Sequence, residues 1–485
     1  MMASMKLQTL ELDDIQGDIL IGLQKVAENF IFFKLASAPA FKILSKSYLL
    51  ERITSSREGQ QRELIIRYGK RLGGQTGAPF HGVGLALTKD GLTQLLGADR
   101  QKLCPAFERG ADHPDTIATL NDPPKLSWLR EFVSDRIDGV FLVTGRDRSA
   151  VALHSNELLA LLRRSIKVVY SEIGTTRPGA ERGHEHFGFL DGISNPGIRG
   201  LTPASNRMYK SNEGLPGQDL IWPGEFVFGH PGQHPDDPVK AGPEPRLAAP
   251  WMRNGSYMVF RRLEQKVPEF RRFVRESAAR LGMDPELLAA RMVGRWKSGA
   301  PVELTPLRDD SPLGADERRN NDFGFGDDRF QRKCPFAAHI RKVYPRDDVA
   351  LAEAQRHRII RRGIPFGPEV APGETTTRHS RGLMFVCYQT SIERQLEYIQ
   401  RRYANNPEFV DGKERPGGGG LVEPGFDPII GQAPGNGPRW MDEPYPNYSA
   451  GNRRTALEMP SQFVVLTAAA YFFMPSISAL RTMLT

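Results

Sequence analysis

The sequence predicts an α+β fold of two related units, each with an antiparallel sheet. Strand-like and helix-like patterns alternate through the first half of the chain, and the same order returns more weakly in the second half. A length of 485 residues allows two or three compact units at about 150 residues per domain. Because the chain has no short repeat, this recurrence indicates a duplication and not a solenoid.

The first unit is predicted from runs of apolar and β-branched residues that alternate with patterns of helical spacing. We expect strands at 29–35, 82–88, 139–145 and 166–170, helices at 40–53 and 150–162, and a short helix that ends at Leu96. Without its insertions, this is the β-α-β-β-α-β order of a ferredoxin-like unit.

The second unit repeats this order with larger insertions. We expect strands at 255–262, 382–389 and 463–473, and helices at 269–281 and 392–403. The predicted divisions are an N-terminal domain at 1–195, a connection at 196–250 and a C-terminal domain at 251–485. The connection and a second irregular stretch, 405–460, are rich in Gly and Pro. Loops of this length are usually functional or disordered, and we expect both to wrap a site.

Charge, hydropathy and cysteine content argue against several classes of partner. The net charge of +8 comes from 65 basic and 57 acidic residues that are interspersed, which argues against nucleic-acid binding. The most apolar stretch, 463–474, is too short to span a bilayer and stops at Pro475, so we expect no membrane partner. Three scattered cysteines and the lack of a signal-like pattern at 1–14 predict a cytoplasmic protein without disulfides.

One stretch in the middle of the chain, 187–196, holds an acid in unusual surroundings. Asp191 stands in an Asp-Gly pair within a strand-like run, with Phe189, Leu190 and Ile193 around it. Apolar neighbours raise the free energy of a charged carboxylate, which is one way to tune an acid for proton transfer. Asp-Gly between apolar residues is also a common hairpin turn, so both interpretations stand at this point.

Two histidines just before this stretch suggest a metal site. On a strand, His184 and His186 would face the same side, and Asp191 could be a third ligand to zinc. That arrangement would predict a metal hydrolase. The alternative is two polar residues on a strand face, because no further ligand of characteristic spacing is evident.

A different cofactor is suggested by the stretch 334–342. His339 follows small and apolar residues and precedes Arg341 and Lys342, a pattern that suits an axial haem ligand with cations for the haem carboxylates. The alternative is a satisfied core histidine, which is the commoner role of a lone His.

A pair of arginines offers a further chemical group. Arg361 and Arg362 carry permanent, forked hydrogen-bond donors that could stabilise a developing oxyanion in a dry site. The alternative is an ordinary solvated loop.

Taken together, these motifs resemble the dye-decolorizing peroxidase family, specifically its larger, fungal-like members. Gly188-Phe189-Leu190-Asp191-Gly192 matches the family's G-x-x-D-G signature. The resemblance continues in family order from about residue 15 to 476, through motifs at 15–20, 220–226, 254–257, 338–342, 381–389 and 471–476. It implies a haem enzyme of two ferredoxin-like halves, with the haem held mainly by the second.

The resemblance implies which residues hold the cofactor, haem b (iron protoporphyrin IX). His339 would bind the iron from one side, and Asp427 would be the anionic hydrogen-bond partner of its ring. The remaining predicted haem contacts are Leu383, Phe385, Ile193 and Arg341.

On the opposite, distal side of the haem, the resemblance places the catalytic pair. Asp191 would be the acid and base. Arg361 would be the distal arginine, because it stands four residues before Pro365-Phe366 as in the family, and Arg362 is the neighbour that could be confused with it.

The implied reaction is the reduction of hydrogen peroxide with one-electron oxidation of dyes, phenols or other small organic donors. Asp191 would move a proton from one peroxide oxygen to the other, while Arg361 stabilises the negative charge that builds. Because a carboxylate acts as a base above a pKa of about 4, the enzyme could work in acid. We expect a monomer or a homodimer.

Two positions depart from the family pattern. Gly363 stands where many relatives have Asn or Ser, which keeps open a haem-binding or haem-handling protein with little turnover. Phe366 stands where some fungal relatives have a Tyr near the haem edge, and Phe is much harder to oxidise. Bulky dyes would then need a surface radical site at Trp440, Trp251 or Tyr388.

Overall fold

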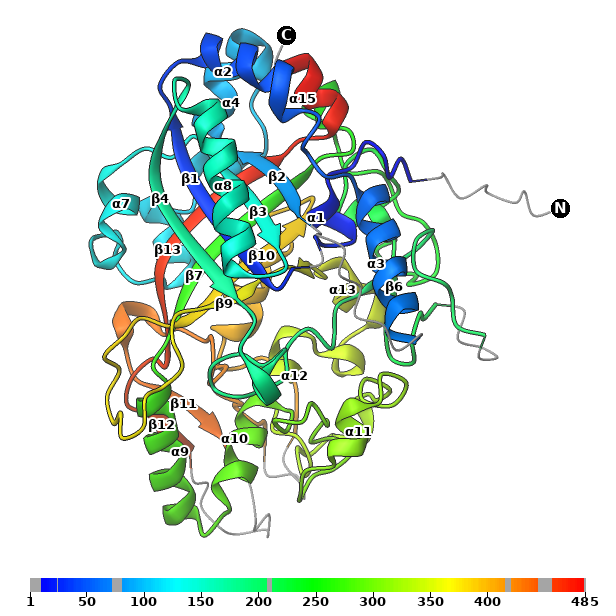
Figure 1. The fold of residues 1–485 in the computed structure, drawn as a ribbon. Coiled ribbons are helices and arrows are strands. Elements are labelled where there is room, and N and C mark those ends of the chain that lie inside the picture. The colour runs from blue at the N-terminus through cyan, green and yellow to red at the C-terminus, as the bar shows by residue number, and fades with distance from the viewer. Residues whose placement is uncertain are drawn as a thin grey trace, which may run out of the picture.

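The centre of the molecule is a nine-stranded antiparallel sheet in the order β4-β1-β3-β2-β13-β7-β10-β8, with β9 also paired to β10 (Figure 1). The computed structural model describes residues 10–23, 25–71, 81–206, 212–414, 420–443 and 456–483. Within them the strands of this sheet are β1 (Ala27–Leu35), β2 (Gly82–Leu87), β3 (Gly139–Gly145), β4 (Ile166–Thr175), β7 (Ser256–Gln265), β8 (Ile360–Arg361), β9 (Ile364–Phe366), β10 (Gly382–Gln389) and β13 (Val464–Met474).

The first half of the sheet forms the first predicted unit. Strands β4, β1, β3 and β2 lie side by side in the order of a ferredoxin-like unit. Its helices include α2 (Ala38–Leu44) and α8 (Arg148–Leu162), and α8 begins where Asp147 accepts a hydrogen bond from Ala150 N at 2.7 Å. Helix α3 (Ser56–Arg71) does not appear in the sequence prediction, because charged and polar residues outnumber its apolar ones.

The second half repeats the same order as β13-β7-β10-β8, which confirms the predicted fold class. Helix α9 (Val267–Leu281) follows β7 and ends at Gly282, whose φ of 63° suits a residue without Cβ. Helix α14 (Leu396–Tyr398) follows β10 and continues as a π-helix over Ile399–Ala404. Strands β8 and β9 are the part of this unit that the sequence does not predict.

Aromatic side chains join the two units. The sheet is continuous through the pair Phe473 and Leu87, where β13 meets β2. It also curls, so that Phe32 of β1 reaches Phe260 of β7 with 4.8 Å between ring centroids. Both residues are fully buried. The two units therefore share one core, which holds the second half of the sheet in a fixed place.

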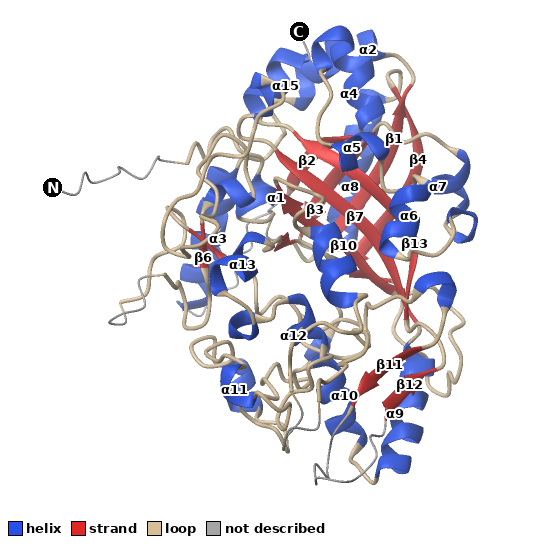
Figure 2. Ribbon diagram, turned by 180° about the vertical axis from the view of Figure 1, so that it is seen from behind, coloured by secondary structure: helices blue, strands red, loops and turns tan. Residues whose placement is uncertain are grey.

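Shorter elements surround the sheet. Figure 2 shows α5 (Pro105–Arg109) and α6 (Pro114–Leu120) over the side of the sheet opposite to α8. The remaining helices are α1 (Gly17–Leu20), α4 (Lys89–Leu96), α7 (Arg130–Ser134), α10 (Pro285–Val293), α11 (Ser311–Ala315), α12 (His339–Val343), α13 (Leu351–Arg356) and α15 (Ile477–Met483). Two small sheets pair β5 (Gly197–Ile198) with β6 (Leu220–Ile221), and β11 (Arg439–Asp442) with β12 (Ala456–Met459).

Two further expectations concern cysteines and membranes. Cys104, Cys334 and Cys387 are all free thiols, as their number and spacing predict. None of the helices within the described ranges is both long enough and apolar enough to cross a bilayer.

Candidate active site

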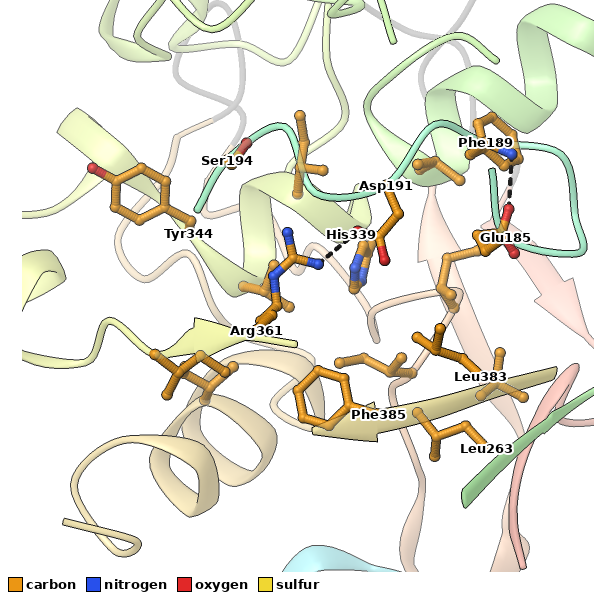
Figure 3. A pocket seen from close by; sticks show the side chains of 18 of the residues that line it. Glu185, Phe189, Asp191, Ser194, Leu263, His339, Tyr344, Arg361, Leu383 and Phe385 are labelled. Atoms are coloured by element: carbon orange, nitrogen blue, oxygen red, sulfur yellow. Dashed lines mark hydrogen bonds and ion pairs between the residues drawn. The ribbon is translucent and has the colours of Figure 1, made fainter. Parts of the chain in front are cut away.

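A large cavity lies between the second half of the sheet and the segments that follow its strands (Figure 3). Its walls come from the segment 185–194, β7, α12, the strands β8 and β10, and the loop 429–432. The space between these walls is about 1840 Å³ when counted out to the open mouth. Polar side chains and apolar side chains from segments far apart in the sequence meet around this one space.

Asp191 stands in a tightly turned loop on the wall of this cavity. Gly188 and Gly192 adopt φ values of 103° and 85°, which residues with a side chain rarely adopt. The Asp191 N–H donates to Gly183 O at 3.0 Å, and the Gly192 N–H donates to Asp191 Oδ1 at 2.6 Å. The expected strand-like run is thus a loop, which confirms the turn interpretation, and the same turn places Asp191 on the cavity wall.

A second acid, Glu185, holds this loop from inside. Its carboxylate accepts hydrogen bonds from Phe187 N at 2.9 Å and Phe189 N at 2.8 Å, and from the Gln265 amide. Burial raises the pKa of Glu185, and these hydrogen bonds offset part of that effect. Glu185 therefore fixes the turn that aims Asp191.

Asp191 forms an ion pair with Arg361 across the cavity wall. Arg361 Nη1 donates to Asp191 Oδ1 at 2.7 Å, and both side chains are open to the cavity, at 31% and 38% exposure respectively (Figure 3). Burial is the largest single influence and raises the pKa of Asp191, but the charge and hydrogen bond of Arg361, the Gly192 N–H and the charge of His339 together lower it more. The pKa of Asp191 consequently lies below its ordinary value of 3.8, and the group is a carboxylate at neutral pH.

The neighbouring arginine has a different place. Arg362 donates from Nε to Asp18 O at 3.0 Å and from Nη2 to Leu20 O at 2.6 Å. It thereby ties β8 to the N-terminal motif 15–20. Of the two arginines that the sequence leaves hard to tell apart, Arg361 is the one that meets Asp191.

His339 presents one ring nitrogen to the cavity. Its Nδ1 lies 2.8 Å from Oδ2 of the fully buried Asp427. The other oxygen, Oδ1, accepts from Ile429 N at 2.8 Å and Ile430 N at 3.0 Å. Because this carboxylate accepts, Nδ1 carries the proton, and the lone pair of Nε2 is free for a ligand.

An apolar wall faces the polar groups. Leu383 and Phe385 of β10 alternate with Met384 and Val386, which are buried in the core on the other face of the strand. Ile193 joins this lining from the loop after Asp191. The structure thus brings Leu383, Phe385 and Ile193 together around one cavity with the acid and the histidine.

The expectation that Arg341 contacts haem is wrong. Its guanidinium is fully buried away from the cavity, with Nε 2.6 Å from Asp348 Oδ2 and Nη1 3.1 Å from Asp328 Oδ2. Residues two apart on a helix point about 200° apart, because each residue turns about 100°. With His339 facing the cavity from α12, Arg341 must face the protein. Lys342 likewise turns to the backbone oxygens of Asn406 and Phe409.

Three other arginines line the cavity where Arg341 was expected. Arg295, Arg346 and Arg358 have no carboxylate within ion-pair distance among the described residues, and they bind carbonyl, hydroxyl and amide oxygens instead. Burial lowers the pKa of Arg295 to about 9 and of the other two to about 10. All three remain charged at neutral pH. They lie far apart in the sequence, so no local pattern reveals them.

The two histidines proposed for zinc do not form a metal site. His184 Nε2 lies 3.1 Å from Lys297 O, while His186 Nε2 lies 2.8 Å from Phe366 O. They are not on a common strand. No group of three potential metal ligands occurs in the part of the chain that the structure describes. The metal hydrolase therefore has no structural support.

The structure shows the surroundings of the two residues that depart from the family pattern. A Cβ at Gly363 would lie 2.8 Å from Met384 O, so β10 leaves no room there for a side chain. Phe366 is buried, and Arg262 stacks over its ring at 4.0 Å. Tyr388 is fully buried with its hydroxyl 2.7 Å from Asp18 Oδ2, so it cannot be the expected surface radical site.

The two long irregular segments differ in what they contribute. The stretch 405–460 supplies Asp427, Ile429, Ile430 and Gln432, and it contains the hairpin of β11 and β12. None of the described residues of 196–250 lines the cavity. The expectation that both segments wrap the site is therefore correct only for the second.

The chain is similar to known proteins over nearly its whole length. Residues 14–178 match the family model described as "DyP dimeric alpha+beta barrel domain", and residues 244–421 match "Dyp-type peroxidase, C-terminal". The chain is 38% identical to a dye-decolorizing peroxidase of Mycetinis scorodonius, over 98% of this chain and 88% of the relative. It is also 38% identical to a dye-decolorizing peroxidase of Exidia glandulosa, over 97% and 87% of the two chains.

Solved structures show the same architecture. An ancestral D-type dye-decolorizing peroxidase superimposes with a TM-score of 0.84 at 39% identity, covering 99% of this chain and all of the other. A dye-decolorizing peroxidase in complex with 2,6-dimethoxyphenol superimposes with a TM-score of 0.78 at 34% identity, over 98% of this chain and all of the other.

Proposed function

The chain belongs to the dye-decolorizing peroxidase family and is a peroxidase, and we propose from the cavity how its residues divide the reaction. Members of this family are haem enzymes, which makes haem the cofactor. The single observation that carries the proposal is the 2.7 Å pair of Asp191 and Arg361 in the same cavity as His339 and its buried partner Asp427.

The residues of the cavity fit haem b. His339 offers Nε2 as a ligand for iron, and no hydrogen-bond partner for that atom occurs among the described residues. The wall of Leu383, Phe385 and Ile193 suits the apolar face of a porphyrin. Arg295, Arg346 and Arg358, which lack carboxylate partners, suit the two carboxylates of protoporphyrin IX. When bound, haem supplies the redox chemistry, taking two oxidising equivalents from peroxide and returning them to donors one at a time.

Asp191 is the proton carrier of the proposed mechanism. Its low pKa keeps Oδ1 and Oδ2 unprotonated at neutral pH, so the carboxylate can accept a proton from one oxygen of hydrogen peroxide. It then delivers that proton to the other oxygen, which leaves as water. Two donor molecules each lose one electron, and with two protons the second oxygen also ends as water.

Arg361 and Asp427 set the charges around this transfer. The Arg361 guanidinium stabilises the negative charge that develops as the oxygen–oxygen bond breaks, and it keeps Asp191 ionised. Asp427 accepts a hydrogen bond from Nδ1–H of His339, which orients the ring and makes Nε2 a stronger electron donor. Both effects favour peroxide cleavage.

The proposed donors are dyes and phenols. The solved relative that contains 2,6-dimethoxyphenol supports phenols for this chain, since the two chains match over nearly their full length. Half-buried Trp251 and Trp440 remain candidates for oxidising donors too bulky to enter the cavity.

The proposal is tested by loading the purified protein with haem and measuring oxidation of 2,6-dimethoxyphenol with hydrogen peroxide. We expect turnover and a Soret band in the wild type, and loss of both in His339→Ala. His184→Gln is the matched control, because His184 lies outside the proposed haem contacts, and it should keep haem. Full haem binding by His339→Ala would show that another residue is the ligand.

A further inference from the structure

Arg361 lies on the edge strand of the sheet, so its backbone needs a partner outside the sheet. The register pairs Arg361 with Cys387, and the next residue, Arg362, donates from its N–H to Val386 O at 2.8 Å. Hydrogen-bonded and non-hydrogen-bonded pairs alternate along antiparallel strands. The N–H and C=O of Arg361 therefore point away from β10, off the edge of the sheet.

Asn195 satisfies both of these groups with one side chain. The Arg361 N–H donates to Asn195 Oδ1 at 3.1 Å, and Asn195 Nδ2 donates to Arg361 O at 3.3 Å. This is the pairing that a further strand would give. Asn195 stands four residues after Asp191, so the same loop that carries the acid also holds the backbone of the arginine.

The loop is itself anchored on both sides of Asn195. Gln218 Nε2 donates to Asn195 O at 3.1 Å. The preceding carbonyl, Ser194 O, accepts from Arg358 Nη2 at 2.6 Å. Movement of β8 relative to this loop would break several hydrogen bonds at once, and the side-chain amide of Asn195 is the contact made directly to Arg361.

A second, smaller cavity gives this contact its importance. Asn195, Asp191, Arg361 and Gly363 all line it, and it adjoins the main cavity. Position 363 cannot supply a polar side chain, because its Cβ would lie 2.8 Å from Met384 O. The amide of Asn195 holds the backbone of Arg361 here, while Lys25 Nζ donates to the next carbonyl, Arg362 O, at 2.7 Å.

We propose that Asn195 is a positioning residue for the peroxide reaction, acting through the backbone of Arg361 to hold its guanidinium against Asp191. The inference rests on the role proposed for Arg361. Misplacement of a charged group by about 1 Å can cost on the order of 100-fold in rate. Replacing Asn195 with Ala removes both amide contacts and should slow the reaction with peroxide about 10- to 100-fold.

The test is a double-mutant cycle on the haem-loaded enzyme. The rate of reaction with hydrogen peroxide is measured by stopped-flow absorbance for the wild type, Asn195→Ala, Arg361→Leu and the double variant. If Asn195 acts through Arg361, its replacement slows the wild type but has no further effect in the Arg361→Leu background. Asn212→Ala is the control, since Asn212 binds Arg199 outside both cavities.

The outcomes separate this inference from the proposed function. An unchanged rate in Asn195→Ala, or equal losses in both backgrounds, overturns the positioning role. An unchanged rate in Arg361→Leu overturns the role of Arg361 itself. Hydrogen exchange gives a readout without turnover: the Arg361 amide should be protected in the wild-type protein and exchange faster in Asn195→Ser. Rapid exchange in the wild type would contradict the proposal even if neither variant folds.

Discussion

Replacing Arg361 with Leu should change the pH dependence of the peroxide reaction as well as its rate. In the wild type, burial raises the pKa of Asp191, and Arg361, with the Gly192 N–H and His339, brings it below 3.8. Without the guanidinium, burial is opposed only by the Gly192 N–H and His339, so the pKa of Asp191 should rise. The base-competent carboxylate is lost as the pH falls through this pKa. The acid limb of the rate profile should therefore move to higher pH.

The size of the rate effect follows from the attraction between the Arg361 guanidinium and the negative charge that builds on the peroxide oxygen. Two unit charges about 4 Å apart attract by about 4 kcal/mol at an effective dielectric constant of about 20. The side chains of Arg361 and Asp191 are 31% and 38% exposed, so solvent in the cavity screens part of this attraction. After screening, about 1–3 kcal/mol of this attraction remains. Since about 1.4 kcal/mol corresponds to a tenfold change in rate, Arg361→Leu should slow the reaction roughly 5- to 150-fold.

The assay is stopped-flow measurement of the reaction with hydrogen peroxide from acid to neutral pH. Arg57→Leu is the control, because the Arg57 and Asp13 side chains form an exposed surface pair and should leave the profile unchanged. An acid limb that stays at the wild-type pH in Arg361→Leu would refute the electrostatic coupling of Arg361 to Asp191.

Two other substitutions test the surroundings of the site. Asp427→Asn removes the anion behind His339. We expect about 10- to 100-fold weaker activity and a higher reduction potential in a spectroelectrochemical titration. An unchanged potential would contradict the role of Asp427. Gly363→Asn places a Cβ 2.8 Å from Met384 O. We expect thermal unfolding to show a free energy of unfolding lower by about 1–3 kcal/mol, without a gain in activity. A variant that is as stable as the wild type and faster would contradict this.

The sequence predicts the parts of the fold and the site that local patterns encode. The paired order of strands and helices defines both units, and the alternation at Leu383 and Phe385 gives one apolar face of β10. Asp191 and His339 stand in short motifs, which can be recognised because they follow one another in the same order as in the family. Each of these features depends on neighbours in the chain.

The remaining features depend on contacts between distant segments. Strand β8 has two residues and carries an arginine, so its pairing with β10 cannot be inferred from propensity. Arg295, Arg346 and Arg358 converge only in the folded chain. Arg341 is expected at the cavity because it follows His339, but the helical turn of α12 directs it into the protein. Asn195 similarly acquires its role from a partner at position 361.

The role of Asp191 as proton carrier is tested most directly by Asp191→Asn in the haem-loaded enzyme. The amide keeps the size and much of the hydrogen bonding of the side chain but cannot accept a proton from peroxide. Because His339 is untouched, haem should stay bound. We expect the stopped-flow rate of reaction with hydrogen peroxide to fall by about 100- to 10,000-fold. A variant that binds haem and reacts with peroxide at the wild-type rate would contradict the role of Asp191.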